Sequence, residues 1–153
     1  MIRLIASLGY AGYSPVAPGT AGTAVAAVLF WLCREWPAPV HAALALFILA
    51  VGIPVAGRAE QSYGQADCGK IVIDECAGFW ISVLFLPTTL PVVVLAFFVF
   101  RFFDIAKVFP ANLIERRLPG GWGVMLDDAV AGLYTNLVLR AGVALFGPGL
   151  FFK

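Results

Sequence analysis

Five apolar segments, separated by connections rich in charge, proline and glycine, constrain most strongly what this chain can fold into. They cover residues 20–33, 40–57, 71–86, 92–103 and 124–146. Hydrophobic residues make up 61% of the 153 residues and charged residues 12%, whereas a soluble domain has about 25% charged residues. A soluble fold of this size could not bury so much apolar surface, so we expect lipid to cover part of it. The sequence therefore predicts an all-α, polytopic membrane helical bundle of about five apolar helices.

The connections refine this expectation. The third and fourth segments are shorter than the ~20 residues that usually span a bilayer, so we expect tilt, local bilayer thinning or partial insertion there. The polar stretch 104–123 predicts an interfacial helical segment between the fourth and fifth helices. Neither a flexible linker nor a repeat divides the sequence, so residues 1–153 are expected to form one membrane-embedded domain.

Basic residues predict the orientation of the bundle. They gather around the connections after the second and fourth helices, as Arg58, Lys70, Arg101, Lys107, Arg116 and Arg117, whereas the alternate connections hold only Arg34. The positive-inside rule places the basic connections in the cytoplasm. With five spans the N-terminus is also cytoplasmic, and the tail that ends at Lys153 lies outside. The net charge of +1 gives no indication of a nucleic-acid partner.

Acidic residues are expected to meet at the same cytoplasmic boundary. Asp74 and Glu75 begin the third helix, Asp104 ends the fourth, and Asp127 and Asp128 begin the fifth. A charged side chain at the bilayer centre costs about 2.5–3.5 kcal/mol on insertion scales, so such a group of acids needs a compensating partner. A bound cation would compensate the negative charge of these residues. Oxygen ligands without a nearby histidine favour magnesium, manganese or calcium over zinc or copper.

Neighbouring residues are suited to phosphate. Arg101, Asp104 and Lys107 follow each other at intervals of three, which on a continuing helix places two cations beside one acid. The glycine-rich stretches 19–23 and 120–123 lie where the first and last helices begin, and helix N-termini bind anions. Phosphatase chemistry that needs Cys-x5-Arg is excluded, because no cysteine is followed by arginine at that spacing. His41 is the only histidine, which excludes phosphatases that need two.

Each of these features has a structural alternative. Asp127 and Asp128 could complement the dipole of a first helical turn, and Arg101 and Lys107 could extend to lipid headgroups. Thr20 could be a helix N-cap. The glycines that follow two of the acids by four residues, Gly78 and Gly132, are expected to be points of close helix packing rather than ligands.

Four sequence strings resemble one enzyme family along nearly the whole chain. They are PGTAGT at 18–23, IDECAG at 73–78, FRFFDIAK at 100–107 and GGWGVMLDDAVAG at 120–132, and they resemble the bacterial phosphatidylglycerophosphatase A family. The resemblance implies a magnesium-dependent, multi-pass enzyme of the bacterial inner membrane that converts phosphatidylglycerophosphate to phosphatidylglycerol and inorganic phosphate. Two departures are visible: Thr23 stands where the family usually has serine, and KVFP at 107–110 replaces its usual Lys-Pro-x-Pro.

The resulting hypothesis assigns roles to the candidate residues. Mg²⁺ is held among Asp74, Glu75, Asp127 and Asp128, and Asp104 is a further ligand or the general base. The expected catalytic residues are therefore Asp74, Asp104, Asp127 and Asp128. The expected phosphate-binding residues are Arg101, Lys107, Gly19, Thr20 and Thr23. Water and an aspartate remain alternative nucleophiles.

Other classes of membrane protein remain open. A transporter or proton-coupled channel also contains intramembrane carboxylates, although it would place them along a path near mid-bilayer. Another Mg²⁺-dependent lipid-headgroup enzyme, such as a CDP-alcohol phosphotransferase, would use acids too, but its Asp-Gly-x2-Ala-Arg signature is absent. A structural subunit would need no metal. The expected partners are the bilayer and the phospholipid substrate, and both a monomer and a homodimer fit the sequence.

Overall fold

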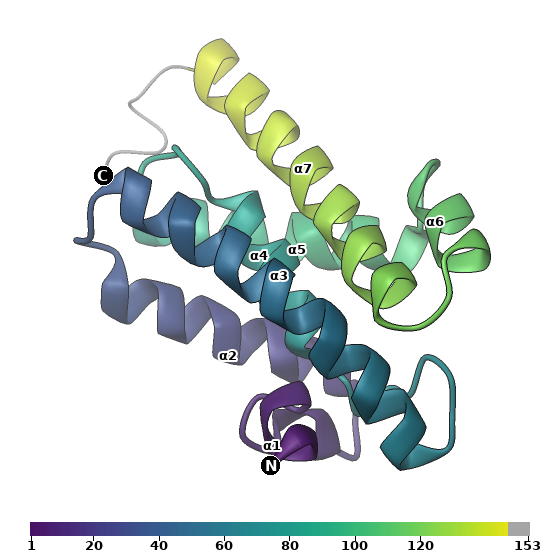
Figure 1. Cartoon of the computed structure of the whole chain (residues 1–153). Coiled ribbons are helices and arrows are strands. Elements are labelled where there is room, and N and C mark those ends of the chain that lie inside the picture. The colour runs from purple at the N-terminus through teal and green to yellow at the C-terminus, as the bar shows by residue number, and fades with distance from the viewer. Residues whose placement is uncertain (147–153) are drawn as a thin grey trace.

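The computed structural model describes residues 1–146 and folds them into helices, without a strand in that range (Figure 1). The elements are α1 (Ile2–Ala6), the 3-10 helix η1 (Ala11–Tyr13), α2 (Pro18–Cys33), α3 (Ala38–Tyr63), α4 (Ile73–Ser82), α5 (Leu90–Ala106), α6 (Ala111–Arg117) and α7 (Gly121–Phe146). The predicted all-α class is confirmed, and each apolar segment of the sequence corresponds to one helix. A short helix, α6, lies between the fourth and fifth of them. The expected position of Lys153 falls outside the described residues.

Local sequence explains most helix boundaries. Proline occupies the first turn of α2, α3 and α5, where its missing N–H is not needed. The polar stretch from Arg58 was expected to be a connection, but α3 continues through it to Tyr63. It ends at Gly64, which has a φ of 68°. The sequence AEQ at 59–61 favours helix, and glycine adopts the left-handed conformation without strain, so the helix ends there rather than at the change in polarity.

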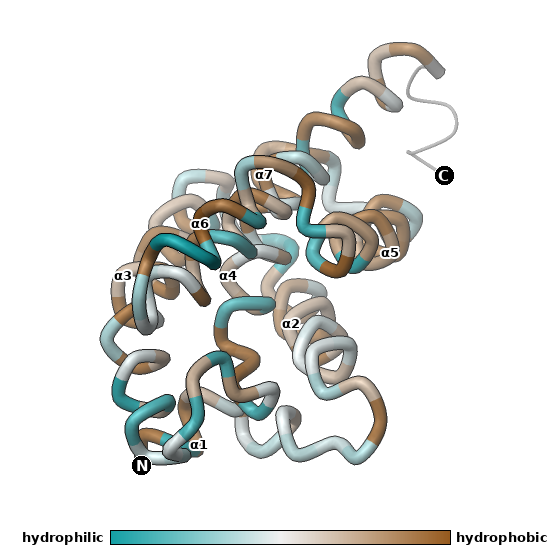
Figure 2. Tube along the Cα trace, turned by 90° about the vertical axis from the view of Figure 1, so that its right-hand side faces the viewer, coloured by the Kyte–Doolittle hydropathy of each residue, from teal (hydrophilic) through white to brown (hydrophobic). Residues whose placement is uncertain are grey.

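Helix α3 is the one helix in residues 1–146 that is both long and apolar enough to cross a membrane. Only 28% of its most apolar 18-residue window is buried within the protein, so most of that window faces outward. Helix α2 is apolar but shorter, and α4 has only ten residues. In Figure 2, α6 carries much of the hydrophilic colour, and α5 is mostly hydrophobic. The five-span arrangement therefore remains a prediction.

The short helix α4 forms the centre of the fold. Eight of its ten residues are buried, and it packs against α2, α3, α5 and α7. Its most extensive contact is with α7, which passes in front of α4 and α5 in Figure 1. Phe79 and Trp80 of α4 join Phe30 of α2 and Phe100 of α5 in the larger apolar core. This packing buries α4 although it is too short to cross a bilayer unaided.

Two glycines bring α4 and α7 into close contact. A Cβ atom on Gly78 would lie 2.6 Å from the backbone oxygen of Asp128 and 2.5 Å from Cε2 of Phe100. A Cβ atom on Gly132 would overlap the backbone oxygen of Gly78. The helices therefore touch backbone to backbone, as the two glycines predicted.

The end of α4 is capped by a side chain of α7. Asn136 Nδ2 donates to the backbone oxygens of Ile81, Ser82 and Leu84 at 3.3, 3.0 and 2.9 Å. Arg140 donates to the same Leu84 oxygen at 3.0 Å and to Asn136 Oδ1 at 2.7 Å. These bonds satisfy carbonyl groups that a helix end leaves without a donor. A carbonyl group without a donor costs free energy where water is absent.

Candidate active site

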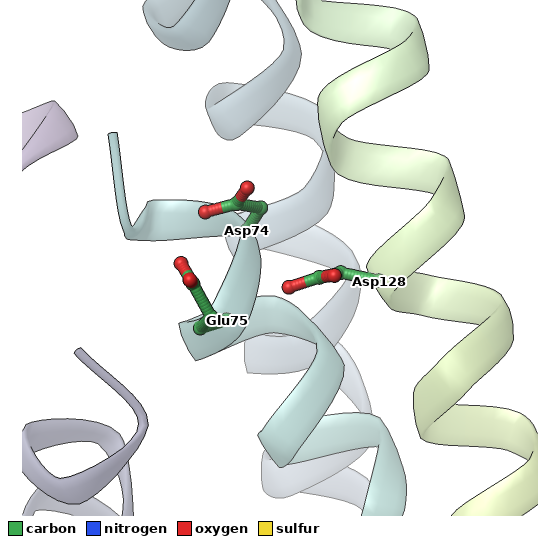
Figure 3. Close-up of side chains that lie close together, drawn as sticks. All are labelled: Asp74, Glu75 and Asp128. Atoms are coloured by element: carbon green, nitrogen blue, oxygen red, sulfur yellow. The ribbon is translucent and has the colours of Figure 1, made fainter. Parts of the chain in front are cut away.

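Three carboxylates from two helices converge at the start of α4. Asp74 and Glu75 occupy the first turn of α4, and Asp128 lies on α7, four residues before Gly132. One carboxylate oxygen from each lies within 4.8 Å of the others, and Figure 3 shows the side chains directed toward one another. We call Asp74, Glu75 and Asp128 the acidic cluster. The contact of α4 with α7 at Gly78 brings it together.

The acidic cluster fits a divalent cation. Each member has a buried oxygen without a hydrogen-bond partner: Asp74 Oδ1, Glu75 Oε2 and Asp128 Oδ2. Glu75 and Asp128 are 8% and 3% exposed as residues, whereas Asp74 is half-buried. Like charges held this close repel one another, and unpaired buried oxygens lose the free energy of solvation. An oxygen-only donor set of this kind suits a hard ion such as Mg²⁺, Mn²⁺ or Ca²⁺.

Arg101 of α5 borders the acidic cluster. Its Nη1 lies 3.6 Å from Glu75 Oε1 and forms an ion pair with Asp104 three residues later. Asp104 is also close enough to interact with the carboxyl of Asp128. The Arg101 Nε is buried without a partner, so the guanidinium retains a free donor beside the cluster. The structure thus places both predicted α5 residues at the site.

The start of α2 lies against the same residues. A Cβ atom on Gly19 would overlap Glu75 Oε1 and would lie 3.0 Å from Nη1 of Arg101, so a larger residue there would displace both side chains. Thr20 follows in the same turn and is half-buried. Thr23 is fully buried, and its hydroxyl donates to the Gly19 backbone oxygen at 2.9 Å. Its one hydrogen is used within α2, because the helix turns that side chain back toward the preceding turn.

Lys107 was expected on a helix that continues past Asp104, and this expectation is wrong. Helix α5 ends at Ala106, and Lys107 takes the left-handed conformation with a φ of 43°. Its Nζ lies 2.7 Å from Asp127 Oδ2 and 2.8 Å from Glu115 Oε1. Burial alone would lower the pKa of Lys107, but the hydrogen bonds to Asp127 and Glu115 raise it above its ordinary value. Lys107 is therefore a cation shared by two carboxylates.

Asp127 lies outside the acidic cluster. One of its oxygens pairs with Lys107, and the other accepts the backbone N–H of Asp128 at 2.9 Å. Adjacent residues on a helix point about 100° apart, so Asp127 and Asp128 meet different partners. Helix α7 begins at Gly121, so neither acid lies in its first turn, and the helix-dipole alternative does not apply.

A pocket of about 240 Å³ opens beside Asp127. Glu115, Glu60 and Asp67 contribute further carboxylates to its wall, and the exposed Arg116 lies at its edge. Sequence reasoning did not select Glu115. It lies eight residues from Lys107 in a polar stretch, and no spacing rule connects residues on either side of a chain reversal.

Comparisons with known proteins agree with the resemblance seen in the sequence. The family model described as Phosphatidylglycerophosphatase A matches residues 4–143. Phosphatidylglycerophosphatase A of Escherichia coli (strain K12) is 33% identical over 124 residues, which is 80% of this chain and 69% of that protein.

Two further relatives have similar identities. A candidate phosphatidylinositol-3-phosphatase of Bacteroides thetaiotaomicron is 36% identical over 109 residues, 69% of this chain and 67% of that protein. Phosphatidylglycerophosphatase A of Haemophilus influenzae is 35% identical over 92 residues, 60% of this chain and 56% of that protein. No solved structure matches the chain.

Proposed function

This chain belongs to the phosphatidylglycerophosphatase A family, and we propose that it hydrolyses the terminal phosphate monoester of phosphatidylglycerophosphate to phosphatidylglycerol and inorganic phosphate. The observation that carries the proposal is the acidic cluster, in which three carboxylates each keep an unpartnered buried oxygen beside the guanidinium of Arg101. Carboxylates that hold a cation next to an arginine that binds anions are suited to phosphoryl transfer.

Mg²⁺ is the cofactor in this proposal. Asp74, Glu75 and Asp128 would hold it, since their unpartnered oxygens converge. When bound, Mg²⁺ would withdraw charge from the phosphate oxygens as the P–O bond breaks. Asp127, which the sequence also suggested as a ligand, supports the cluster instead through its bond to the Asp128 backbone.

The remaining residues bind phosphate and move the proton. The free Nε donor of Arg101 neutralises a phosphate oxygen, and the first turn of α2 at Gly19 and Thr20 offers backbone N–H groups to another. Asp104, beside Arg101, accepts a proton from the attacking water, and the glycerol oxygen leaves with a proton from solvent. Lys107 lies at the edge of the site, where its ammonium offsets the charges of Asp127 and Glu115.

We place this site at the cytoplasmic face of a multi-pass inner-membrane protein. Helices α2, α3, α4, α5 and α7 would form the membrane bundle, with α6 at the interface. The exposed arginines Arg116 and Arg117 next to the site support this orientation through the positive-inside rule. Single cysteines can be introduced at Arg117 and at Glu35 in a variant without the native cysteines. With a membrane-impermeant thiol reagent, the cysteine at position 117 should react in inverted vesicles and the cysteine at position 35 in right-side-out vesicles.

Phosphate release from the purified protein in detergent tests the activity. Phosphatidylglycerophosphate should be hydrolysed with Mg²⁺ and not after the divalent cations are removed. Asp128→Asn should abolish turnover in folded protein, whereas Glu35→Gln should not, because Glu35 lies at the far end of α2 with an 81% exposed side chain. Full activity in Asp128→Asn would remove the acidic cluster from the mechanism. Failure of the wild-type protein to release phosphate would instead favour a transport or structural role.

Phosphatidylinositol 3-phosphate is the second candidate substrate, because the Bacteroides relative carries that name. Both lipids present a phosphate monoester, so the same residues would act on either. Assaying the two lipids side by side, at equal surface concentration in mixed micelles, decides between them. A higher kcat/KM for phosphatidylinositol 3-phosphate would overturn the proposed substrate but keep the reaction class.

A further inference from the structure

We infer that Glu115 is a positioning residue of this site, which from α6 holds the Lys107 ammonium against Asp127 and thereby fixes the backbone that carries Asp128. The inference rests on the proposed function for its catalytic consequence. Its structural part rests only on the contacts of α6. It makes α6 a component of the site rather than a connection between α5 and α7.

The contacts form one continuous chain. Glu115 Oε1 lies 2.8 Å from Lys107 Nζ, and Lys107 Nζ lies 2.7 Å from Asp127 Oδ2. The other oxygen of Asp127 accepts the backbone N–H of Asp128 at 2.9 Å. Three segments of the chain, the end of α5, α6 and α7, therefore meet at one ammonium group. The last bond of this chain ends on a member of the acidic cluster.

Burial explains why a second carboxylate is needed. The Asp127 side chain is 5% exposed, whereas those of Lys107 and Glu115 are 31% and 34% exposed. A lysine is a point charge on a flexible stem, and one carboxylate leaves it free to rotate. Glu115 removes that freedom from the more exposed side, so the ammonium stays on the buried acid. Without Glu115, Lys107 can turn toward water and leave Asp127 as a buried charge without a partner.

The backbone at Lys107 agrees with this role. Lys107 takes the left-handed conformation, with a φ of 43°, which a residue with a side chain rarely adopts unless its surroundings hold it. The two ion pairs are the contacts that direct its side chain back toward α7. Lys107 itself was predicted from the sequence, but the residue that orients it was not.

Kinetics test the positioning role. Glu115→Gln should lower kcat on phosphatidylglycerophosphate by about 10- to 100-fold. This loss is typical when a side chain that orients a metal ligand is replaced. KM should change less, and Glu115→Asp should restore most of the rate because it keeps the charge. In a Lys107→Met background, Glu115→Gln should have no further effect, because Glu115 acts through Lys107. Glu35→Gln is the matched control and should behave as the wild type.

Lysine reactivity tests the contact independently of activity. Acetic anhydride labelling of Lys107, followed by mass spectrometry, should be several-fold faster in Glu115→Gln, while Lys70 on the exposed loop keeps its rate. Unchanged labelling of Lys107 would overturn the contact. Faster labelling of Lys107 with a wild-type kcat would overturn the positioning role. So would a kcat in the Lys107→Met, Glu115→Gln double variant that is reduced by the product of the two single losses. If the wild-type protein hydrolyses no phosphatidylglycerophosphate, the proposed function fails, and labelling still decides whether Glu115 holds Lys107.

Discussion

A single methyl group at Gly78 should disable the site, because this glycine sets the distance between α4 and α7. A Cβ atom there would lie 2.5 and 2.7 Å from two ring carbons of Phe100 and 2.6 Å from the backbone oxygen of Asp128. Carbon atoms in contact normally lie about 3.5–4.0 Å apart, so α7 or the Phe100 ring must move by about 1 Å. The ring can rotate, but the backbone oxygen can move only with α7 and its Asp128 carboxylate.

The loss of activity should exceed the loss of stability. Overpacking of this kind costs about 1–3 kcal/mol, and the better helix propensity of alanine returns about 1 kcal/mol, so unfolding should become easier by about 0–2 kcal/mol. A shift of about 1 Å in a catalytic group can cost about 10²-fold in rate. Gly78→Ala should therefore purify as folded protein, with a slightly lower Tm in detergent and greatly reduced phosphate release.

Gly57→Ala provides the matched control for this prediction. Gly57 is also a helical glycine that faces α7, but a Cβ atom there would lie 3.4 Å from the nearest atom, the backbone nitrogen of Gly121. It should keep wild-type activity and gain up to about 1 kcal/mol in stability. The reasoning is refuted if Gly78→Ala releases phosphate at the wild-type rate with the wild-type dependence on Mg²⁺.

Three further predictions follow from the contacts around the site. Asn136→Leu should lower the free energy of unfolding by about 1–2 kcal/mol, because the last carbonyls of α4 lose their donor; a Tm equal to the wild type would contradict this. Removing divalent cations should abolish the activity and lower the Tm, because the free energy of unfolding falls by about 2–3 kcal/mol relative to protein with Mg²⁺ at ~100 times its Kd, and Asp128→Asn should lose this response. Arg101→Gln should reduce kcat/KM by about 10²–10³-fold because Glu75 and the phosphate both lose a cation, whereas Arg34→Gln, at the far end of α2, should not.

The helices were predictable because their signals are local. Apolar runs, first-turn prolines and glycines locate α2, α3, α5 and α7 in the sequence to within a few residues, apart from the end of α3. The short elements α1 and η1 were missed, since Arg3, Gly9 and Gly12 interrupt any periodic pattern there. Their geometry depends on distant contacts, such as the backbone of Lys70 against Gly12.

The sequence predicted that acidic side chains from different helices would meet, but not which of them do. Helix spacing alone could have separated the two adjacent acids of α7, because Asp128 shares a face with Gly132 and Asn136 while Asp127 does not. The end of α5 at Lys107 depends on where its side chain finds partners, and Glu115 reaches it only after the chain reverses. Long-range pairing of this kind leaves no periodic trace in the sequence.

Because α4 packs most extensively against α7, its packing cannot be completed until α7 has been synthesised. Helix α4 leaves the ribosome some forty residues before α7, as residues 73–82 precede 121–146. Until α7 follows, the nascent chain presents Asp74, Glu75 and the uncapped carbonyls of α4 without the groups that later cover them. That surface stays uncovered in the interval, so a nascent chain arrested before Gly121 should be cleaved by proteases faster than the completed chain.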